Sequence, residues 1–354
     1  MVITGLIVVL LLVLVLPFAV KKVEENLEVF LFLMGVAASS ISGIMNVELA
    51  LKALEEPWMI ALAVLVAGAL FFVLKDKFAS FMHHVFAKVP VAAVVFLAIL
   101  LLGLLSSVIT AIVASIILVE IIYFLPMQRN QKVIVCIIAC FSIGLGAALT
   151  PIGEPLATIA ISKLGEDFFY LFTLLGKYII PAVVFFAVLG AVYTSFAVKR
   201  GGEQAELAIT ADEVLESEEE VEEESWKTII VRALKVYLFV MALVFLGEGF
   251  EPLINAYILG LSPNLLYWVN MVSAVLDNAT LTAAEISPQM DTLTVEAILM
   301  GLLVSGGMLI PGNIPNIISA SKLKITSTEW AKLGVPLGLI VMVVFYLLLF
   351  VVLA

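Results

Sequence analysis

Charged residues are scarce in this chain of 354 residues: Asp, Glu, Lys and Arg together make up 13% of it, against about 25% in soluble domains. Hydrophobic residues make up 63%, and the mean hydropathy is +1.21. This balance excludes an ordinary soluble protein. Several apolar stretches of roughly 18–20 residues are long enough to cross a hydrocarbon core of about 30 Å. We therefore predict an integral membrane protein surrounded by lipid.

Reactive side chains are also few, with two cysteines and two histidines. Cys136 and Cys140 lie one turn apart on an apolar helix, which is typical of packing residues and not of a disulfide or metal site. His83 and His84 are adjacent and point in different directions; proton sensing at headgroup level is an open alternative for them. The apolar segments contain no recognisable nucleophile–base pair or metal cluster. We expect no enzyme, no cofactor and no nucleic-acid partner.

The net charge of −11 comes from one segment. Residues 203–224 hold 11 of the 29 acids and no base, whereas 18 acids and 18 bases remain outside it. Such a composition is typical of a solvated, disordered linker. We expect an acidic cytoplasmic linker over 199–226, with a divalent-cation sensor as the alternative.

Eight apolar segments are predicted to cross the membrane as helices. They lie near residues 3–20, 28–46, 57–75, 132–149, 171–197, 227–247, 293–310 and 333–353. The first lacks the basic start and the cleavage site of a signal peptide, so we expect it to be retained.

Two further apolar segments, 90–125 and 263–288, are interrupted by polar residues. The interruptions are Ser106, Ser107 and Thr110 in the first segment and Asp277, Asn278 and Thr280 in the second. Each segment is predicted to be a re-entrant hairpin, in which two half-helices meet at a polar tip. Irregular backbone at membrane depth is stable only where protein buries it or where it lines a wet cavity.

The basic residues agree with two hairpins that enter and leave on the same face. One face then receives 15 basic residues, and the opposite face receives Lys52, Lys163 and Lys177. The larger set is Lys21, Lys22, Lys75, Lys77, Lys88, Arg129, Lys132, Lys199, Arg200, Lys227, Arg232, Lys235, Lys322, Lys324 and Lys332. We expect a multi-pass protein of the inner cell membrane, with the basic face cytoplasmic and both termini outside.

The two halves of the chain are similar around these interruptions. "LSSVITAIVASI" (105–116) aligns with "VSAVLDNATLTA" (272–283), and "LTPIGEPLATIAISKL" (149–164) aligns with "LIPGNIPNIISASKL" (309–323). Counting the crossings makes the second half inverted relative to the first. Inverted repeats with broken helices are typical of secondary transporters that hold their substrate near the midplane.

The predicted organisation is all-α. The N-terminal spans and an interfacial helix occupy 1–89, the first repeat 90–198, the linker 199–226 and the second repeat 227–354. Broken helices are expected over 132–163 and 293–323. The prolines that break them, by removing amide donors, are Pro151, Pro155, Pro311 and Pro315. The freed carbonyls and half-helix ends are then available to hold an ion.

We expect the polar groups at the tips and breaks to form the ion or substrate site. They are Ser106, Ser107, Thr110, Thr150, Gly153, Glu154, Asp277, Asn278, Thr280, Ser305, Gly312, Asn313 and Asn316. Two are acids and none is Lys or Arg, and an acid at the bilayer centre costs roughly 2.5–3.5 kcal/mol on insertion scales. Oxygen ligands without a basic clamp favour a hard cation. A carboxylate that holds either H⁺ or Na⁺, never both, suffices for antiport.

Alternatives stay open for each acid. Asp277 could cap the second half-helix of its hairpin, and Glu154 could face solvent at the membrane edge. Glu120 and Glu285, on the returning arms, could be second titrating sites or interfacial residues.

These motifs resemble the ion transporter superfamily, which includes NhaD-type sodium/proton antiporters, arsenite permeases and divalent anion–sodium symporters. "TPIGEP" and "LIPGNIPN" are similar to the paired breaks of the symporters, and "LDNATLTAA" is similar to the antiporter and symporter hairpins. The first hairpin lacks the symporters' Asn, and Glu154 and Pro155 replace part of their Pro-Pro-Asn motif. The resemblance also implies a homodimer and an elevator-like movement.

The leading hypothesis is a Na⁺/H⁺ antiporter, with Na⁺ bound at Asp277, Asn278, Thr110 and Asn313 and protons coupled through Asp277 and Glu154. A sodium-coupled anion or carboxylate symporter is the alternative. A receptor or assembly scaffold without transport is a third possibility.

Overall fold

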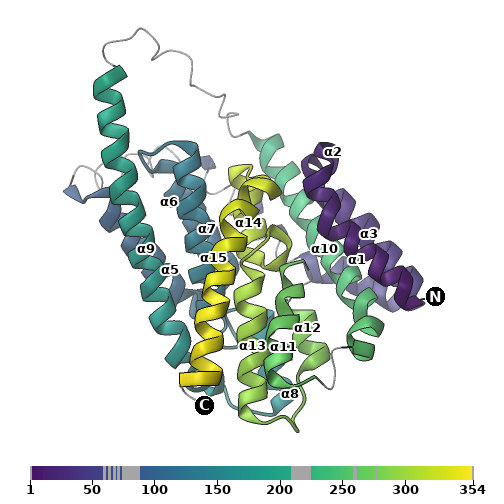
Figure 1. The fold of residues 1–354 in the computed structure, drawn as a ribbon. Coiled ribbons are helices and arrows are strands. Elements are labelled where there is room, and N and C mark those ends of the chain that lie inside the picture. Colours follow the sequence, from purple (N-terminus) through teal and green to yellow (C-terminus); the bar gives the residue numbers. More distant parts are fainter. Residues whose placement is uncertain are drawn as a thin grey trace.

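We analysed a computed structural model of the chain (Figure 1), which describes residues 2–58, 61–62, 65–66, 69, 72–73, 88–208, 225–257, 261–275 and 278–352. The regular structure of these residues is entirely helical, which confirms the predicted all-α class. Most of the predicted span 57–75, together with His83, His84 and Asp277, lies outside the described residues.

Five of the described helices are long and apolar enough to cross a membrane. They are α5 (Val91–Ile109), α7 (Arg129–Ala147), α9 (Tyr170–Ala208), α10 (Trp226–Tyr257) and α15 (Ser327–Leu347). Four coincide with predicted spans. The fifth, α5, lies in the segment that we predicted to be a hairpin. Shorter apolar helices include α1 (Val2–Ala19), α3 (Leu27–Ser42), α6 (Ala111–Phe124), α8 (Pro155–Leu164) and α13 (Thr292–Gly306).

Helix α9 extends past residue 199, the predicted start of the acidic linker. Helix α9 continues to Ala208, so the first third of the expected linker is helical. Residues 203–208 read Glu-Gln-Ala-Glu-Leu-Ala, and all of these are good helix formers. Residues 209–224 lie outside the described part of the chain.

In the first half, the chain reverses direction at Thr110. Helices α5 and α7 run parallel, because Ser142 Oγ donates to Ile99 O (3.1 Å) and, two turns further along, Thr150 Oγ1 donates to Ser107 O. Helix α6 runs the opposite way: it starts near the end of α7, and Tyr123 O near its own end accepts a hydrogen bond from Lys132 Nζ at the beginning of α7 (2.7 Å).

The second half contains α11 (Pro263–Val269), the 3₁₀ helix η1 (Asn270–Ala274), α12 (Asn278–Glu285), α13, the 3₁₀ helix η2 (Ile310–Gly312) and α14 (Ile314–Leu323). The stretch α11–η1 packs along α13 as α5 packs along α7. Ser273 Oγ donates to Leu302 O (3.2 Å), as Ser106 Oγ donates to Ile143 O (3.1 Å) in the first half.

A short helix of each half packs against helices of the other half. Helix α14 packs against α6 and α7 of the first half, and α8 packs against α12 of the second half. Helices α7 and α13 are the most buried of the molecule. Helices α1 and α3 lie beside α10 at one flank (Figure 1), and α2 (Lys21–Glu25) connects them at the opposite end of the molecule from α8 and α12.

Candidate functional site

The first helix interruption occurs where the prolines predict it. Helix α7 ends at Ala147, and α8 begins at Pro155, whose missing amide N–H is harmless at the first helical position. Gly153 is required between them because a Cβ there would lie 1.9 Å from Ala147 O. Thr150 is buried and accepts a hydrogen bond from Ile152 N (3.3 Å).

The turn between α5 and α6 touches this interruption directly. Ala111 N donates to Gly153 O at 2.8 Å. Thr110 adopts φ = 76°, a conformation that non-glycine residues rarely take, and its Oγ1 accepts from Val113 N as the N-cap of α6 (3.3 Å). The predicted tip and the predicted break therefore form one unit.

Glu154 is buried, with only 5% of its surface exposed, and precedes the first residue of α8. The alternative of a solvent-facing loop residue is therefore wrong. The dipole of α8 favours a negative charge at this position.

The second interruption, between α13 and α14, is buried. Gly312 is needed there, because a Cβ would lie 2.5 Å from Gly306 O and 2.8 Å from Ser273 O. Asn316 Nδ2 donates to Gly306 O and Leu309 O, both at 2.8 Å. Asn313 is buried at the N-cap of α14 and lies against Gly144 of α7. Pro311 and Pro315 lie at helix starts, as expected.

At the second turn, Asn278 begins α12 and is 4% exposed. Its Nδ2 atom has no hydrogen-bond partner among the described residues. The Thr280 side chain and all of Asp277 lie outside the described residues, so Asp277 is known here only as the neighbour of Asn278 in sequence.

Three predicted serines donate their hydroxyl protons to backbone carbonyls. Ser106 donates to Gly103 O (2.7 Å), Ser107 to Leu104 O (2.8 Å) and Ser305 to Gly301 O (2.6 Å). These bonds reach back one turn within a helix. The lone pairs of the hydroxyl oxygens can still accept a hydrogen bond or coordinate a cation.

Short helices start at both turns and both interruptions. Helices α6 and α14 lie side by side in the same direction, because Ile112 and Ile116 pack with Ile314 and Ile318, and Glu120 near the end of α6 pairs with Lys322 near the end of α14. Each N-terminus carries roughly half a positive charge. Neighbouring N-termini favour a negatively charged group.

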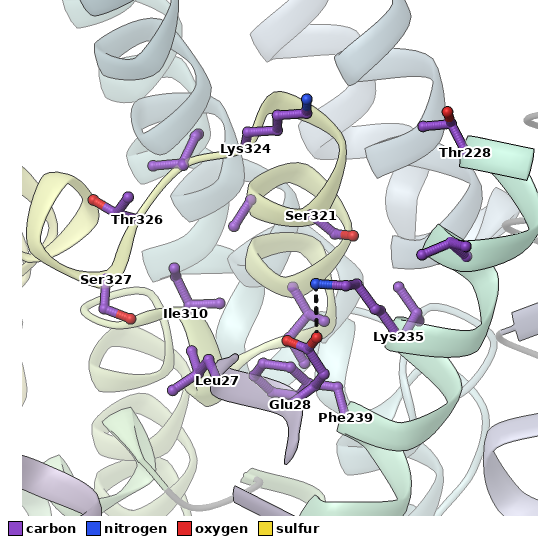
Figure 2. Close-up of a pocket in the computed structure, with 15 residues that line it drawn as sticks. Leu27, Glu28, Thr228, Lys235, Phe239, Ile310, Ser321, Lys324, Thr326 and Ser327 are labelled. Atoms are coloured by element: carbon purple, nitrogen blue, oxygen red, sulfur yellow. Dashed lines mark ion pairs between the residues drawn. The ribbon is translucent and has the colours of Figure 1, made fainter. Parts of the chain in front are cut away.

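A cavity of about 500 Å³ opens beside the second interruption (Figure 2). Its lining comes from the start of α3, from α10, from α14 and from the α14–α15 junction, and it reaches Ile310 of η2. The Lys235–Glu28 ion pair (2.8 Å) joins α10 to α3 within it. A narrow crevice shares Leu27, Ile310 and Ser327 with the cavity and extends to Val275 and Pro311.

The sequence interpretation missed this cavity and two features of the site. Gly103 and Gly146 allow α5 and α7 to touch: a Cβ on Gly146 would lie 1.7 Å from Gly103 O. Asn270 Nδ2 donates to Glu285 Oε2 at 2.8 Å, in a buried pair between η1 and α12. Small residues at apolar helix contacts were the available signal for the glycines. No local pattern predicts the Asn270–Glu285 pair.

Comparison with curated proteins gives no match. One family model, described as "Protein of unknown function (DUF1646)", matches residues 3–352. Because the match covers almost the whole chain, this protein belongs to the DUF1646 family.

Proposed function

We propose that this protein is a secondary active transporter that exchanges a small inorganic cation, Na⁺ in the leading case, for protons. The observation that carries the proposal is the convergence of two helix interruptions with two chain turns in a buried interior. Ala111 N bonds to Gly153 O in the first unit, and Gly312 packs against Ser273 in the second. Interrupted helices at membrane depth are typical of transporter binding sites.

The acids of this region favour a cation as the transported species. Glu154 is buried at the start of α8, and Asp277 directly precedes Asn278 in sequence. No Lys or Arg occurs within 105–116, 147–158, 270–283 or 305–318. We propose that Asp277 and Asn278 bind Na⁺, that Thr110, Asn313 and free carbonyls complete its coordination, and that Asp277 exchanges Na⁺ for a proton.

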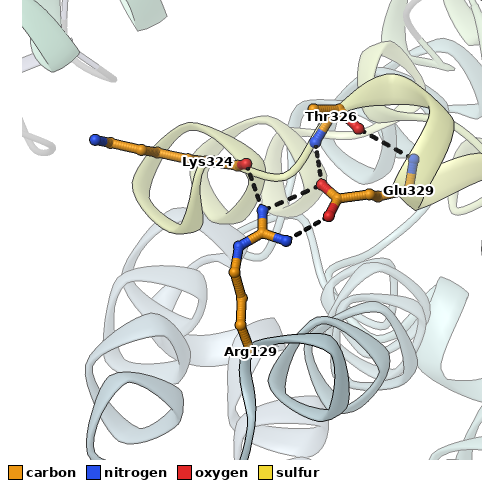
Figure 3. Close-up of polar contacts among 4 residues, drawn as sticks. All are labelled: Arg129, Lys324, Thr326 and Glu329. Atoms are coloured by element: carbon orange, nitrogen blue, oxygen red, sulfur yellow. Dashed lines mark hydrogen bonds and ion pairs between the residues drawn. The ribbon is translucent and has the colours of Figure 1, made fainter. Parts of the chain in front are cut away.

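The proposal includes two inverted repeats, each with a re-entrant hairpin, in the inner cell membrane. The reciprocal packing of α14 on α6 and of α8 on α12 supports a two-fold relation between the halves. The contacts of basic residues support the topology. Arg129 at the start of α7 donates to Lys324 O (2.9 Å), which follows α14, and to Glu329 in the first turn of α15 (Figure 3). These residues belong to the end that we assign to the cytoplasm.

We propose that the 500 Å³ cavity is the cytoplasmic entrance to the site. Lys324 and Thr228, which line it (Figure 2), lie at the end of α14 and the start of α10, on the side that we assign to the cytoplasm. The crevice that continues to Val275 and Pro311 leads toward the second turn and interruption. In this interpretation the structure corresponds to an inward-facing state.

The test is Na⁺-driven proton movement in proteoliposomes that contain a pH-sensitive dye. A Na⁺ gradient should move protons in the opposite direction, and Asp277→Asn should abolish the signal. Asp291→Asn is a matched control, because Asp291 is an exposed N-cap (2.7 Å to Thr294 N) and asparagine caps equally well. Equal exchange in both variants would refute the role of Asp277.

A sodium-coupled anion symporter is the second candidate, and the neighbouring N-termini of α6 and α14 favour it. There the helix N-termini would bind the anion and the acids would bind Na⁺. Uptake of a labelled carboxylate driven by a Na⁺ gradient, without proton counterflow, would select this candidate.

A further inference from the structure

Helix α12 carries a buried polar face. Asn278, Thr282 and Glu285 follow one another at i, i+4 and i+7, so they share one side of the helix. Their exposed fractions are 4%, 0% and 1%. Thr282 Oγ1 donates to Asn278 O at 2.8 Å. Asn270 of η1, which is also fully buried, faces the end of this row.

The contacts of Glu285 leave two complementary atoms unsatisfied. Asn270 Nδ2 donates to Glu285 Oε2 at 2.8 Å and to Ile298 O at 3.5 Å. Glu285 Oε1 and Asn270 Oδ1 have no hydrogen-bond partner among the described residues. Both atoms are acceptors when the carboxyl group is ionised, so the pair lacks one donor.

Within the described residues, no basic side chain forms an ion pair with Glu285 that would neutralise its carboxylate. Helices α8, α10 and α13 pack against α12. Their charged residues include Lys163 on α8, Glu248 and Glu251 on α10, and Glu296 on α13, and Glu154 directly precedes α8. Lys177 pairs with Glu296 (2.9 Å) and Lys52 pairs with Glu248. Within the described residues, none of these groups forms an ion pair with Glu285. An isolated buried carboxylate is very costly.

A single proton would give both unpaired oxygens, Glu285 Oε1 and Asn270 Oδ1, a hydrogen bond. Placed on Glu285 Oε1, it gives the pair an O–H donor that Asn270 Oδ1 can accept, and the carboxylic acid and the amide then hold each other by two hydrogen bonds. We propose that Glu285, with Asn270, is a proton-binding site and that its proton is one of those exchanged for the cation. This coupling role rests on the proposed antiport, whereas the proton site itself does not.

The position of Glu285 suits proton exchange with the outer solution. It is the last residue of α12, and Pro288 and Gln289, a few residues further along the loop to α13, are exposed. The other end of the polar face, at Asn278, is the second turn. The proton would bind Glu285 from the outer side and leave as the carboxylate re-forms, so the step changes only the protonation of one group.

Infrared difference spectroscopy of the purified protein tests the proton site without transport. The wild-type minus Glu285→Gln difference spectrum at neutral pH isolates Glu285 from other protonated carboxyl groups, such as Asp277 and Glu154. It should show the carbonyl band of a protonated carboxylic acid, sensitive to H/D exchange. The exposed Glu251→Gln on α10 is the matched control, and its difference spectrum should lack the band. Absence of the band from the Glu285→Gln difference spectrum would overturn the proposal. So would failure of Glu285→Gln to fold, because glutamine reproduces both hydrogen bonds of the protonated pair.

Transport assays, combined with the infrared band, distinguish a failure of this proposal from a failure of the proposed function. If both hold, Glu285→Gln still binds Na⁺ and moves fewer protons per Na⁺ than wild type, because exchange at Asp277 remains. If wild type shows the band and no exchange, the proton site stands and the antiport fails. If wild type exchanges Na⁺ for protons without the band, the antiport stands and the proton site fails.

Discussion

Substitution of Gly146 by alanine should disrupt the contact that positions the first turn against the first interruption. The new Cβ would lie 1.7 Å from Gly103 O and 2.7 Å from Gly103 C. Carbon and backbone oxygen need a separation of roughly 3.2 Å or more, so α5 and α7 must move apart by about 1.5 Å. The obstacle is backbone on another helix and cannot be removed by a rotamer change.

The expected loss of stability follows from the packing and the hydrogen bonds that this movement strains. Overpacking of an apolar contact costs about 1–3 kcal/mol. Three hydrogen bonds bridge α5 and the α7 region nearby, donated by Ser106, Ser142 and Thr150, and each contributes about 1 kcal/mol. The higher helix propensity of alanine relative to glycine offsets about 1 kcal/mol of this loss. We expect Gly146→Ala to lower the free energy of unfolding by about 3–5 kcal/mol.

The assay is unfolding of the purified protein in detergent, followed by circular dichroism during titration with a denaturing detergent. Gly176→Ala is the matched control, because it lies within helix α9 and its Cβ would meet only Ile180 Cδ1, at 3.7 Å. That variant should be as stable as wild type or more stable by up to about 1 kcal/mol. Equal stability of the two variants would refute the close approach of α5 and α7.

Three further predictions concern the contacts between the halves and the cavity. Glu120→Gln or Lys322→Met alone should destabilise the protein by about 3–5 kcal/mol, because each breaks the largely buried ion pair between α6 and α14. The double variant should cost less than the sum of the singles, and additive effects in a double-mutant cycle would contradict this. Asn316→Leu should cost about 1–3 kcal/mol for each of the two carbonyls that lose a donor, measured in the same titration; a neutral effect would exclude these bonds. Ser321→Cys, with Cys136 and Cys140 replaced by alanine, should react with a membrane-impermeant maleimide from the cytoplasmic side, and reaction from the outside alone would reverse the proposed topology.

The positions of the helix interruptions could be predicted because their causes are local. Pro155 and Pro315 lack amide donors and therefore mark helix starts, and the structure confirms both. The sequence placed the reversal of the first segment somewhere between Ser106 and Thr110, and it did not single out Thr110. Ser106 and Ser107 look like equally good interruptions, but their hydroxyls bond to carbonyls three residues earlier, so α5 continues through them.

Other features depend on residues distant in sequence and left no local pattern. Glu120 had two open interpretations, and only the fold shows that it pairs with Lys322 from the other half. The cavity arises where α3, α10, α14 and the start of α15 meet, and each contributes residues that look unremarkable alone. Glu285 became informative only through Asn270, which belongs to a different helix. Hydropathy and prolines predict helices, whereas pairing between helices needs the three-dimensional arrangement.

The central claim is that a cation and a proton compete for one carboxylate in the interior of the protein. The most direct measurement is the pH change on adding NaCl to purified protein in weakly buffered detergent solution, with choline chloride as the salt control. The account predicts proton release that saturates with Na⁺ concentration in wild type and is lost in Asp277→Asn. Na⁺ binding without proton release, or release that survives in Asp277→Asn, would contradict it.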